Sequence, residues 1–124
     1  MSKVRGYRDL QIWQRSIDAV ERCYRLTWTF PREERYGLAS QLQRAAVSVP
    51  SNIAEGHERN STKSYVYHLG VSRSSVAEVE TQIEIAIRLG YVEADRVDDL
   101  LNEFDQISRV IATIIRKLDE RAEG

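Results

Sequence analysis

The 124-residue sequence is poor in four residue types: it contains one cysteine, one methionine, two prolines and two histidines. Because Cys23 is the only cysteine, an intramolecular disulfide and a cysteine cluster for zinc or an iron–sulfur centre are excluded. Cys23 falls at a helical position beside an apolar stripe. We therefore expect a buried, unreactive thiol and a reducing compartment.

Long apolar runs are also missing. No segment approaches the roughly 20 apolar residues of a membrane span, and no apolar run of signal-peptide type follows the charged N-terminal residues. We therefore expect a cytoplasmic protein that has no membrane partner.

The sequence lacks an excess of charge of either sign. It has 18 Lys and Arg residues against 19 Asp and Glu residues, a net charge of -1, so no global field attracts a polyanion. The first 60 residues nevertheless carry ten basic and seven acidic side chains, whereas residues 93–124 carry five basic and nine acidic ones. The net charge disfavours a general nucleic-acid coat and leaves a local basic surface open.

The sequence motifs that carry catalysis are absent. The six glycines are scattered and form no phosphate-binding fingerprint. Neither His57 nor His68 has a glutamate three residues earlier, as di-iron helix bundles require. The serines at 72, 74 and 75 fall in mid-helix without a local base, where small hydroxyl residues more often allow close helix packing. We predict no catalytic residues, no metal site and no cofactor.

What the sequence does contain is helical periodicity. Apolar residues recur at spacings of three and four in four segments, the pattern of amphipathic helices. The predicted helices cover about residues 9–29, 32–56, 62–89 and 94–120. Short connections make neighbouring helices antiparallel. The predicted fold is all-α: residues 1–124 form one domain, an up-down-up-down four-helix bundle.

Several residues mark where these helices begin, end or bend. Asp9 and either Ser61 or Thr62 are typical N-caps. Gly56 and Gly90 are typical C-terminal stops. In the second segment the apolar spacing continues across Pro50, which indicates one long helix kinked near this proline; two shorter helices are the alternative.

Two stretches, residues 83–89 and 110–118, are more apolar than one buried stripe requires. Self-association would cover these residues, and so would neighbouring helices of the same bundle. The pattern alone favours neither explanation.

A second, polar stripe runs along the predicted helix 32–56, opposite its apolar one. Its side chains are mostly small or amide-bearing, unlike the Glu and Lys mixture of an ordinary solvated face. We define this candidate interaction edge as Gln41, Arg44, Ser48, Ser51, Asn52, Glu55 and Arg59.

Three interpretations compete for the candidate interaction edge. The first, which we rank highest, is a paired polar network in which Arg44 and Glu55 join Arg73 and Glu80 of the third helix. The second is a subunit interface. The third is a site for an anionic partner, with Arg44, Arg59 and Arg73 contacting phosphates.

Four parts of the sequence together carry a family resemblance: Tyr7–Gln14, Phe30–Leu38, Gln41–Gly56 and Ala77–Gln82. They resemble the four-helix-bundle proteins encoded in intervening sequences of bacterial 23S ribosomal RNA genes, and the run from Arg44 to Gly56 is the most specific part. The resemblance implies a left-handed bundle that assembles into a five-fold ring. It implies no enzymatic activity.

These observations lead to two hypotheses about function. The first is a non-enzymatic, homo-oligomeric binding or scaffold protein, a pentameric ring whose partner is a copy of itself. The alternative is an RNA-associated protein that contacts ribosomal or structured RNA through the arginine-bearing edge. Nucleic acid is thus a possible partner, although the net charge does not support it.

Overall fold

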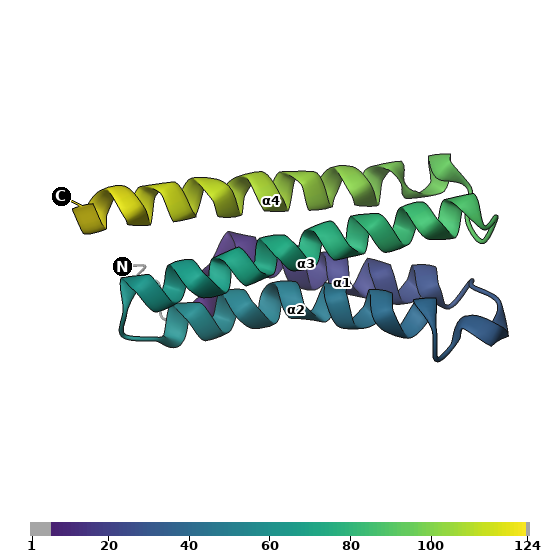
Figure 1. Ribbon diagram of the computed structural model, residues 1–124, viewed down its shortest axis with the longest axis horizontal. Helices are drawn as coiled ribbons and strands as arrows, with labels where there is room; N and C mark the ends of the chain where they lie inside the picture. The colour runs from purple at the N-terminus through teal and green to yellow at the C-terminus, as the bar shows by residue number, and fades with distance from the viewer. Residues whose placement is uncertain (1–5, 124) are drawn as a thin grey trace.

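The computed structural model describes residues 6–123. Four α-helices and two short 3-10 helices follow one another in the order η1 (Tyr7–Asp9), α1 (Gln11–Thr27), η2 (Arg32–Glu34), α2 (Leu38–Glu58), α3 (Thr62–Arg88) and α4 (Ala94–Glu123). Among these described residues there is no strand, so the all-α prediction is confirmed. Figure 1 shows the four α-helices running in alternating directions, as an up-down-up-down bundle requires.

Each helix packs against two neighbours in the cyclic order α1, α2, α3, α4 and back to α1. The centre of the bundle is filled by large apolar side chains that have no solvent exposure, among them Leu42, Ile53, Leu69, Ile83, Phe104 and Ile107. Burying a side chain of this size contributes about 1.5–3 kcal/mol relative to leaving it in water. Packing of the predicted stripes therefore holds the four helices together.

The start of α1 differs from the prediction. Asp9 is not the N-cap, because it ends η1, and α1 begins after Leu10, whose side chain makes no capping hydrogen bond. The turn is held instead by the Leu10 N–H, which donates to the Tyr7 carbonyl oxygen over 3.0 Å. The rings of Tyr7 and Trp13 also pack edge to face, with centroids 5.3 Å apart. A local turn and an aromatic pair thus mark this helix start.

The second helix is displaced relative to the predicted range of 32–56. Arg32–Glu34 form the separate 3-10 turn, and α2 begins at Leu38. The Glu34 Oε1 atom accepts a hydrogen bond from the Leu38 N–H over 2.9 Å, which satisfies one of the unpaired donors of the new helix. Glu34 therefore lies ahead of α2 and caps it, rather than lying inside it.

Gly56 is not the predicted stop, because α2 continues to Glu58 and Gly56 is buried inside it. A Cβ atom at Gly56 would lie 2.8 Å from the Cβ of His68 and 3.0 Å from the Cδ1 of Tyr65. Glycine is thus needed here because α3 approaches the backbone of α2 too closely for any side chain.

Pro50 is buried inside α2, and the helix continues on both sides of it. This confirms one long helix over two shorter ones, while the kink near Pro50 and the left-handed twist stay predictions. Proline has no N–H, so the Ala46 carbonyl lacks its usual helical donor. One residue before the proline, the Ser72 hydroxyl of α3 donates to the Val49 carbonyl oxygen over 2.8 Å.

Both predicted ends of α3 are confirmed. The Ser61 Oγ atom accepts a hydrogen bond from the Ser64 N–H over 3.1 Å, as an N-cap does. At the other end Gly90 has a φ of 80°, and the Tyr91 N–H donates to the Ala86 carbonyl oxygen over 2.9 Å. This is the Schellman pattern, which requires a left-handed residue and therefore favours glycine.

Candidate functional site

The seven residues of the candidate interaction edge do not share one surface. Gln41, Arg44, Ser51, Glu55 and Arg59 are exposed, whereas Ser48 and Asn52 are half-buried against α3. Ser51 lies on the opposite flank, in a hollow shared with α1. A helix turns by about 100° per residue, so side chains three and four apart drift around its surface. The members of the candidate interaction edge therefore face two different neighbours of α2, namely α3 and α1.

The half-buried members belong to a chain of hydrogen bonds between α2 and α3, which we call the α2–α3 polar chain: Ser48, Asn52, His68 and Ser75. The Asn52 amide nitrogen donates to the Ser48 carbonyl oxygen over 3.0 Å and lies 3.1 Å from the Ser48 Oγ. The Ser75 hydroxyl donates to the same Oγ over 2.7 Å. These bonds satisfy polar groups between the packed helices and fix the register of α2 on α3.

The α2–α3 polar chain also determines the tautomer of His68. Because a carbonyl oxygen can only accept, the Asn52 atom facing Ser48 must be the amide nitrogen, and its Oδ1 faces His68. The Nδ1 of His68 lies 2.9 Å from this Oδ1 and therefore carries the proton. The Nε2 atom of neutral His68 is then left as a hydrogen-bond acceptor.

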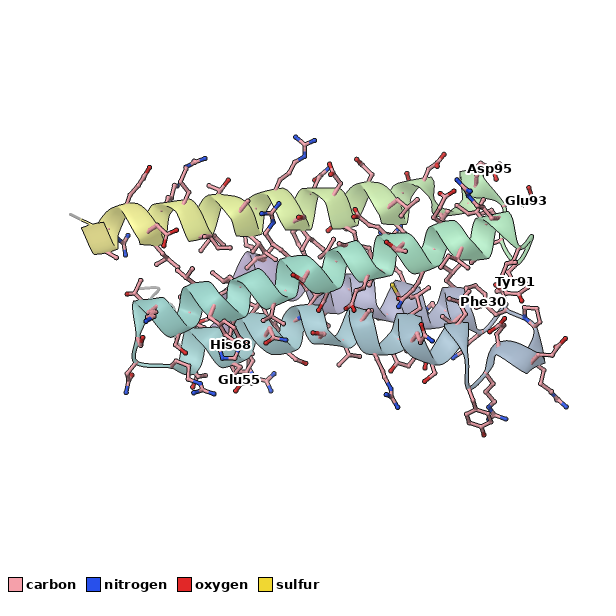
Figure 2. The ribbon with its side chains drawn as sticks, in the orientation of Figure 1. Phe30, Glu55, His68, Tyr91, Glu93 and Asp95 are labelled. Carbon is pink, nitrogen blue, oxygen red and sulfur yellow. The ribbon has the colours of Figure 1, made fainter. Side chains whose placement is uncertain are left out.

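Glu55 and Arg59 close the C-terminal end of the candidate interaction edge. Their side chains form an ion pair of 2.6 Å, and each is about half exposed, at 52%. The hydrogen bond from Arg59, followed by the nearby His68, lowers the pKa of Glu55 below its ordinary value. Figure 2 shows Glu55 and His68 at the same edge, at the end where α2 finishes and α3 begins. Arg59 is thus partly neutralised before any partner arrives.

The four residues of the favoured network interpretation do not pair with one another. Arg73 Nε donates to the Ser108 Oγ of α4 over 3.2 Å. Glu80 lies near Asp105 of α4, and burial followed by this like charge raises its pKa. Arg44 has no hydrogen bond or ion pair with any residue between 6 and 123 that the structure describes. The network interpretation was wrong because Arg73 and Glu80 face α4 rather than α2.

A second ion pair, which the sequence did not suggest, joins α1 to α4. Arg15 donates to both carboxylate oxygens of Glu103 over 2.9 Å, and its Nη2 also donates to Gln106. The hydrogen bond to Glu103 raises the pKa of Arg15, and the same bond lowers the pKa of Glu103. The partners are 88 positions apart, so only the topology brings them together.

The opposite end of the bundle is closed by Glu34 and Tyr91. The Tyr91 hydroxyl donates to the Glu34 Oε2 over 2.8 Å, while Glu34 Oε1 caps α2. The bond from Leu38, followed by that from Tyr91, lowers the pKa of Glu34, and the bond to Glu34 raises the pKa of Tyr91. The Tyr91 ring also packs on Phe30, with centroids 5.7 Å apart (Figure 2). Two loops are thereby held together.

A hollow of about 680 Å³ lies between the end of α1, η2 and the start of α2. We call it the loop hollow. Trp28 and Tyr36, which line it, are 67% and 87% exposed. Its lining residues are Thr27, Trp28, Phe30, Pro31, Arg32, Arg35, Tyr36, Ala39, Ser40 and Gln43. The sequence contained a signal for this site, since both rings fall outside the apolar stripes and between arginines.

A smaller hollow of about 300 Å³, mainly apolar, lies between α1 and α2. We call it the α1–α2 apolar hollow, and it is lined by Tyr7, Trp13, Ile17, Val20, Val47, Pro50, Ser51 and Ala54. Ile17 and Val47 are 41% and 39% exposed, although both carry large apolar side chains. An apolar surface thus adjoins the exposed part of the candidate interaction edge at Ser51.

Cys23 is fully buried, and burial raises the pKa of its thiol to about 12. The prediction of a buried thiol is confirmed, and because the thiolate is the reactive form of cysteine, the raised pKa agrees with low reactivity. Within residues 6–123, no group of three or more His, Cys, Asp or Glu side chains is placed to hold a metal ion. None of the helices described is long and apolar enough to cross a membrane.

Comparison with known proteins agrees with the predicted resemblance. The family described as 23S rRNA-intervening sequence protein matches residues 8–113, which include α1, α2, α3 and most of α4. The chain belongs to this family. No curated protein matches the sequence.

A solved structure shares the fold of this family member. It is the crystal structure of a protein of unknown function from the S23 ribosomal protein family of Bacteroides thetaiotaomicron, superposed with a TM-score of 0.78. The sequence identity is 20%, and the match covers 84% of this chain and 97% of that one. At this identity the similarity establishes the arrangement of helices.

Proposed function

We propose that this intervening-sequence protein is a non-enzymatic, homo-oligomeric binding or scaffold protein that forms a five-membered ring. The observation that carries the proposal is the α1–α2 apolar hollow. Large apolar side chains left partly exposed around a hollow mark a surface that another protein covers. The description of the family to which the chain belongs names no catalytic activity, which agrees with a binding role.

A second apolar surface supports a ring over a simple dimer. Half-buried apolar side chains continue along the C-terminal half of α4, at Val110, Ala112, Ile114, Ile115 and Leu118. In the cyclic order of helices, α4 and α3 lie across the bundle from α1 and α2. A contact between two different surfaces is heterologous, and such contacts close into rings when the rotation allows it. The five-fold number comes from the family resemblance.

Placing a charge in the α1–α2 apolar hollow tests the interface. We expect Val47→Glu to reduce the oligomer to monomers in light scattering at micromolar concentration, because a carboxylate buried without a partner opposes association. Tyr67→Glu is the matched control, since Tyr67 is also a large exposed side chain, 66% exposed, but lies near the start of α3, outside the α1–α2 apolar hollow and the apolar stretch of α4. If Val47→Glu retains the wild-type mass, this surface is not the interface.

RNA association is the second candidate function. It is favoured by Arg44, which is exposed and unpaired among the described residues, and by the five arginines against two glutamates of residues 22–44. Exposed arginines without carboxylate partners are available for phosphates. We therefore propose the Arg44 end of the candidate interaction edge, rather than its Arg59 end, as the RNA contact.

Salt dependence of binding tests this function. We expect structured ribosomal RNA fragments to bind at low ionic strength, and Arg44→Gln to reduce the slope of log affinity against log salt by about one. Arg59→Gln is the control, because Arg59 is already paired with Glu55. Absence of salt-dependent retention by the wild-type protein would contradict RNA association.

A further inference from the structure

We infer that the loop hollow binds unpaired nucleotides of a single-stranded nucleic acid, with bases stacked on Trp28 and Tyr36 and phosphates contacted by the arginines around them. This inference rests on the RNA-association function proposed above and names its site and ligand class. It is carried by the arrangement of rings and guanidinium groups.

The two rings are placed as stacking surfaces. Trp28 directly follows α1 as its C-cap and Tyr36 lies between η2 and α2, with 67% and 87% of their surfaces open to solvent. An aromatic ring that stays in water contributes little to the stability of the fold. Packing of the core therefore does not explain why these two rings are exposed. Every nucleic-acid base has a flat face that can stack on an exposed aromatic ring.

Each ring is accompanied by a guanidinium group. Arg25 lies over the Trp28 ring with its Cζ 5.8 Å from the centroid, and Arg35 lies over the Tyr36 ring at the same distance. Arg32 lines the hollow beside them. Aromatic rings alternating with cations match the alternation of bases and phosphates along a single strand.

Acidic side chains neutralise only part of this surface, where Glu21 forms an ion pair with Arg25 over 2.8 Å. Of the two glutamates in residues 22–44, Glu34 has both carboxylate oxygens engaged, by the Leu38 N–H and by the Tyr91 hydroxyl. The remaining one, Glu33, shares the segment with Arg22, Arg32, Arg35 and Arg44, which form no ion pair with a residue between 6 and 123. Charges more than about 10 Å away are screened in salt, so this local excess matters more to a bound strand than the net charge of -1.

The positive surface continues beyond the loop hollow. On the other side of the last turn of α1, a second hollow of about 380 Å³ is lined by Arg22, Arg25 and Arg96, together with Glu93. On α2, Arg44 follows Ser40, a lining residue of the loop hollow, by one helical turn. A strand seated on the two rings therefore finds further phosphate contacts in either direction.

The cations beside the rings favour a phosphate-bearing strand over a protein partner. Tryptophan, tyrosine and arginine are all enriched in protein interfaces, so it is the arginines without carboxylate partners among the described residues, rather than the rings, that distinguish the loop hollow. The α1–α2 apolar hollow has the opposite composition, with no charged residue among its lining residues. The two surfaces thus suit different partners, a strand and a second copy of the chain.

Fluorescence anisotropy of an end-labelled oligouridine at low salt tests the inference. We expect Trp28→Ala and Tyr36→Ala each to raise the Kd about tenfold, the effect of losing one stacked base. Tyr67→Ala is the matched control, because Tyr67 is equally exposed, at 66%, but lies near the start of α3 at the other end of the bundle. Arg35→Gln should weaken binding and Arg121→Gln, near the end of α4, should not.

The outcomes separate this inference from the functions on which it rests. An oligothymidine compared with the oligouridine shows whether RNA is preferred, and a duplex that binds more weakly than either supports stacking. If structured RNA binds but Trp28→Ala and Tyr36→Ala leave the oligouridine Kd unchanged, the loop hollow is not the site and RNA association survives. If neither the structured RNA nor the oligouridine binds, both the RNA-association function and this inference are contradicted. If the two variants instead change the oligomer mass, the hollow is a subunit interface and the inference is overturned.

Discussion

At the scale of single residues, Gly56 and Gly70 both lie inside helices, yet their surroundings differ. A Cβ at Gly56 would meet the Cβ of His68 at 2.8 Å, whereas a Cβ at Gly70 would meet nothing within 4 Å. The Cβ of His68 is fixed by the α3 backbone and cannot move aside by a rotamer change. Gly56 therefore sets the spacing between α2 and α3, and with it the α2–α3 polar chain.

We expect Gly56→Ala and Gly70→Ala to change stability in opposite directions. Overpacking at Gly56 should cost about 1–3 kcal/mol. At Gly70 alanine should add about 0.5–1 kcal/mol, because it favours a helix over glycine without meeting a neighbour. Urea unfolding followed by circular dichroism measures both. Equal effects of the two substitutions would show that only helix propensity matters.

At the scale of helices, the ion pair of Arg15 and Glu103 links α1 to α4, the neighbouring pair with the fewest other contacts. The bidentate geometry and partial burial of the two side chains, 35% and 24% exposed, distinguish it from the i,i+4 pairs on the bundle surface. Such a geometry favours the ionised form of Glu103 in the folded state. The pair therefore makes stability depend on pH.

The sign of this pH dependence follows from the lowered pKa of Glu103. The stabilisation is fully present above the unfolded pKa of about 4.3 and is lost as the pH falls through the lower folded pKa. We expect the wild-type protein to lose more stability than Glu103→Gln between neutral pH and the acidic range, measured by urea unfolding. Glu120→Gln, an exposed position near the end of α4, should behave like the wild type. Parallel curves for all proteins would contradict the role of this pair.

The sequence predicted the helices better than their ends. The apolar spacing of three and four is repeated over many residues, so single exceptions do not hide it. A helix end depends on a few contacts, which the apolar spacing does not reveal: at Asp9 a Tyr7–Trp13 ring pair across the helix start, and at Gly56 the approach of α3. Ser61 and Gly90 were predicted correctly because their caps are local.

The candidate site was less accessible to sequence reasoning than the fold. The sequence showed the unusual composition of the candidate interaction edge. It did not show that Asn52 faces α3 while Ser51 faces α1. The pairing of Arg73 with Ser108 required the three-dimensional arrangement. The exposed rings of Trp28 and Tyr36 were readable as residues outside the stripes, although only the structure shows that they share one hollow.

At the scale of the whole molecule, the two ends of the bundle and its two flanks have different chemistry. Arginines and exposed rings lie at the end of the bundle where the chain passes from α1 to α2, and the α2–α3 polar chain lies toward the opposite end. On the flanks, apolar side chains remain partly exposed on α1, α2 and α4. A ring built through the apolar flanks would leave the loop hollows free. Each subunit would then present the same strand-binding end, and repetition would strengthen binding through multivalency.

Native mass spectrometry of the purified wild-type protein tests the central claim, self-association, most directly. The account predicts an assembly whose mass is a multiple of the 14.3 kDa chain, with five copies expected from the ring. A species of 14.3 kDa alone at micromolar concentration would contradict it.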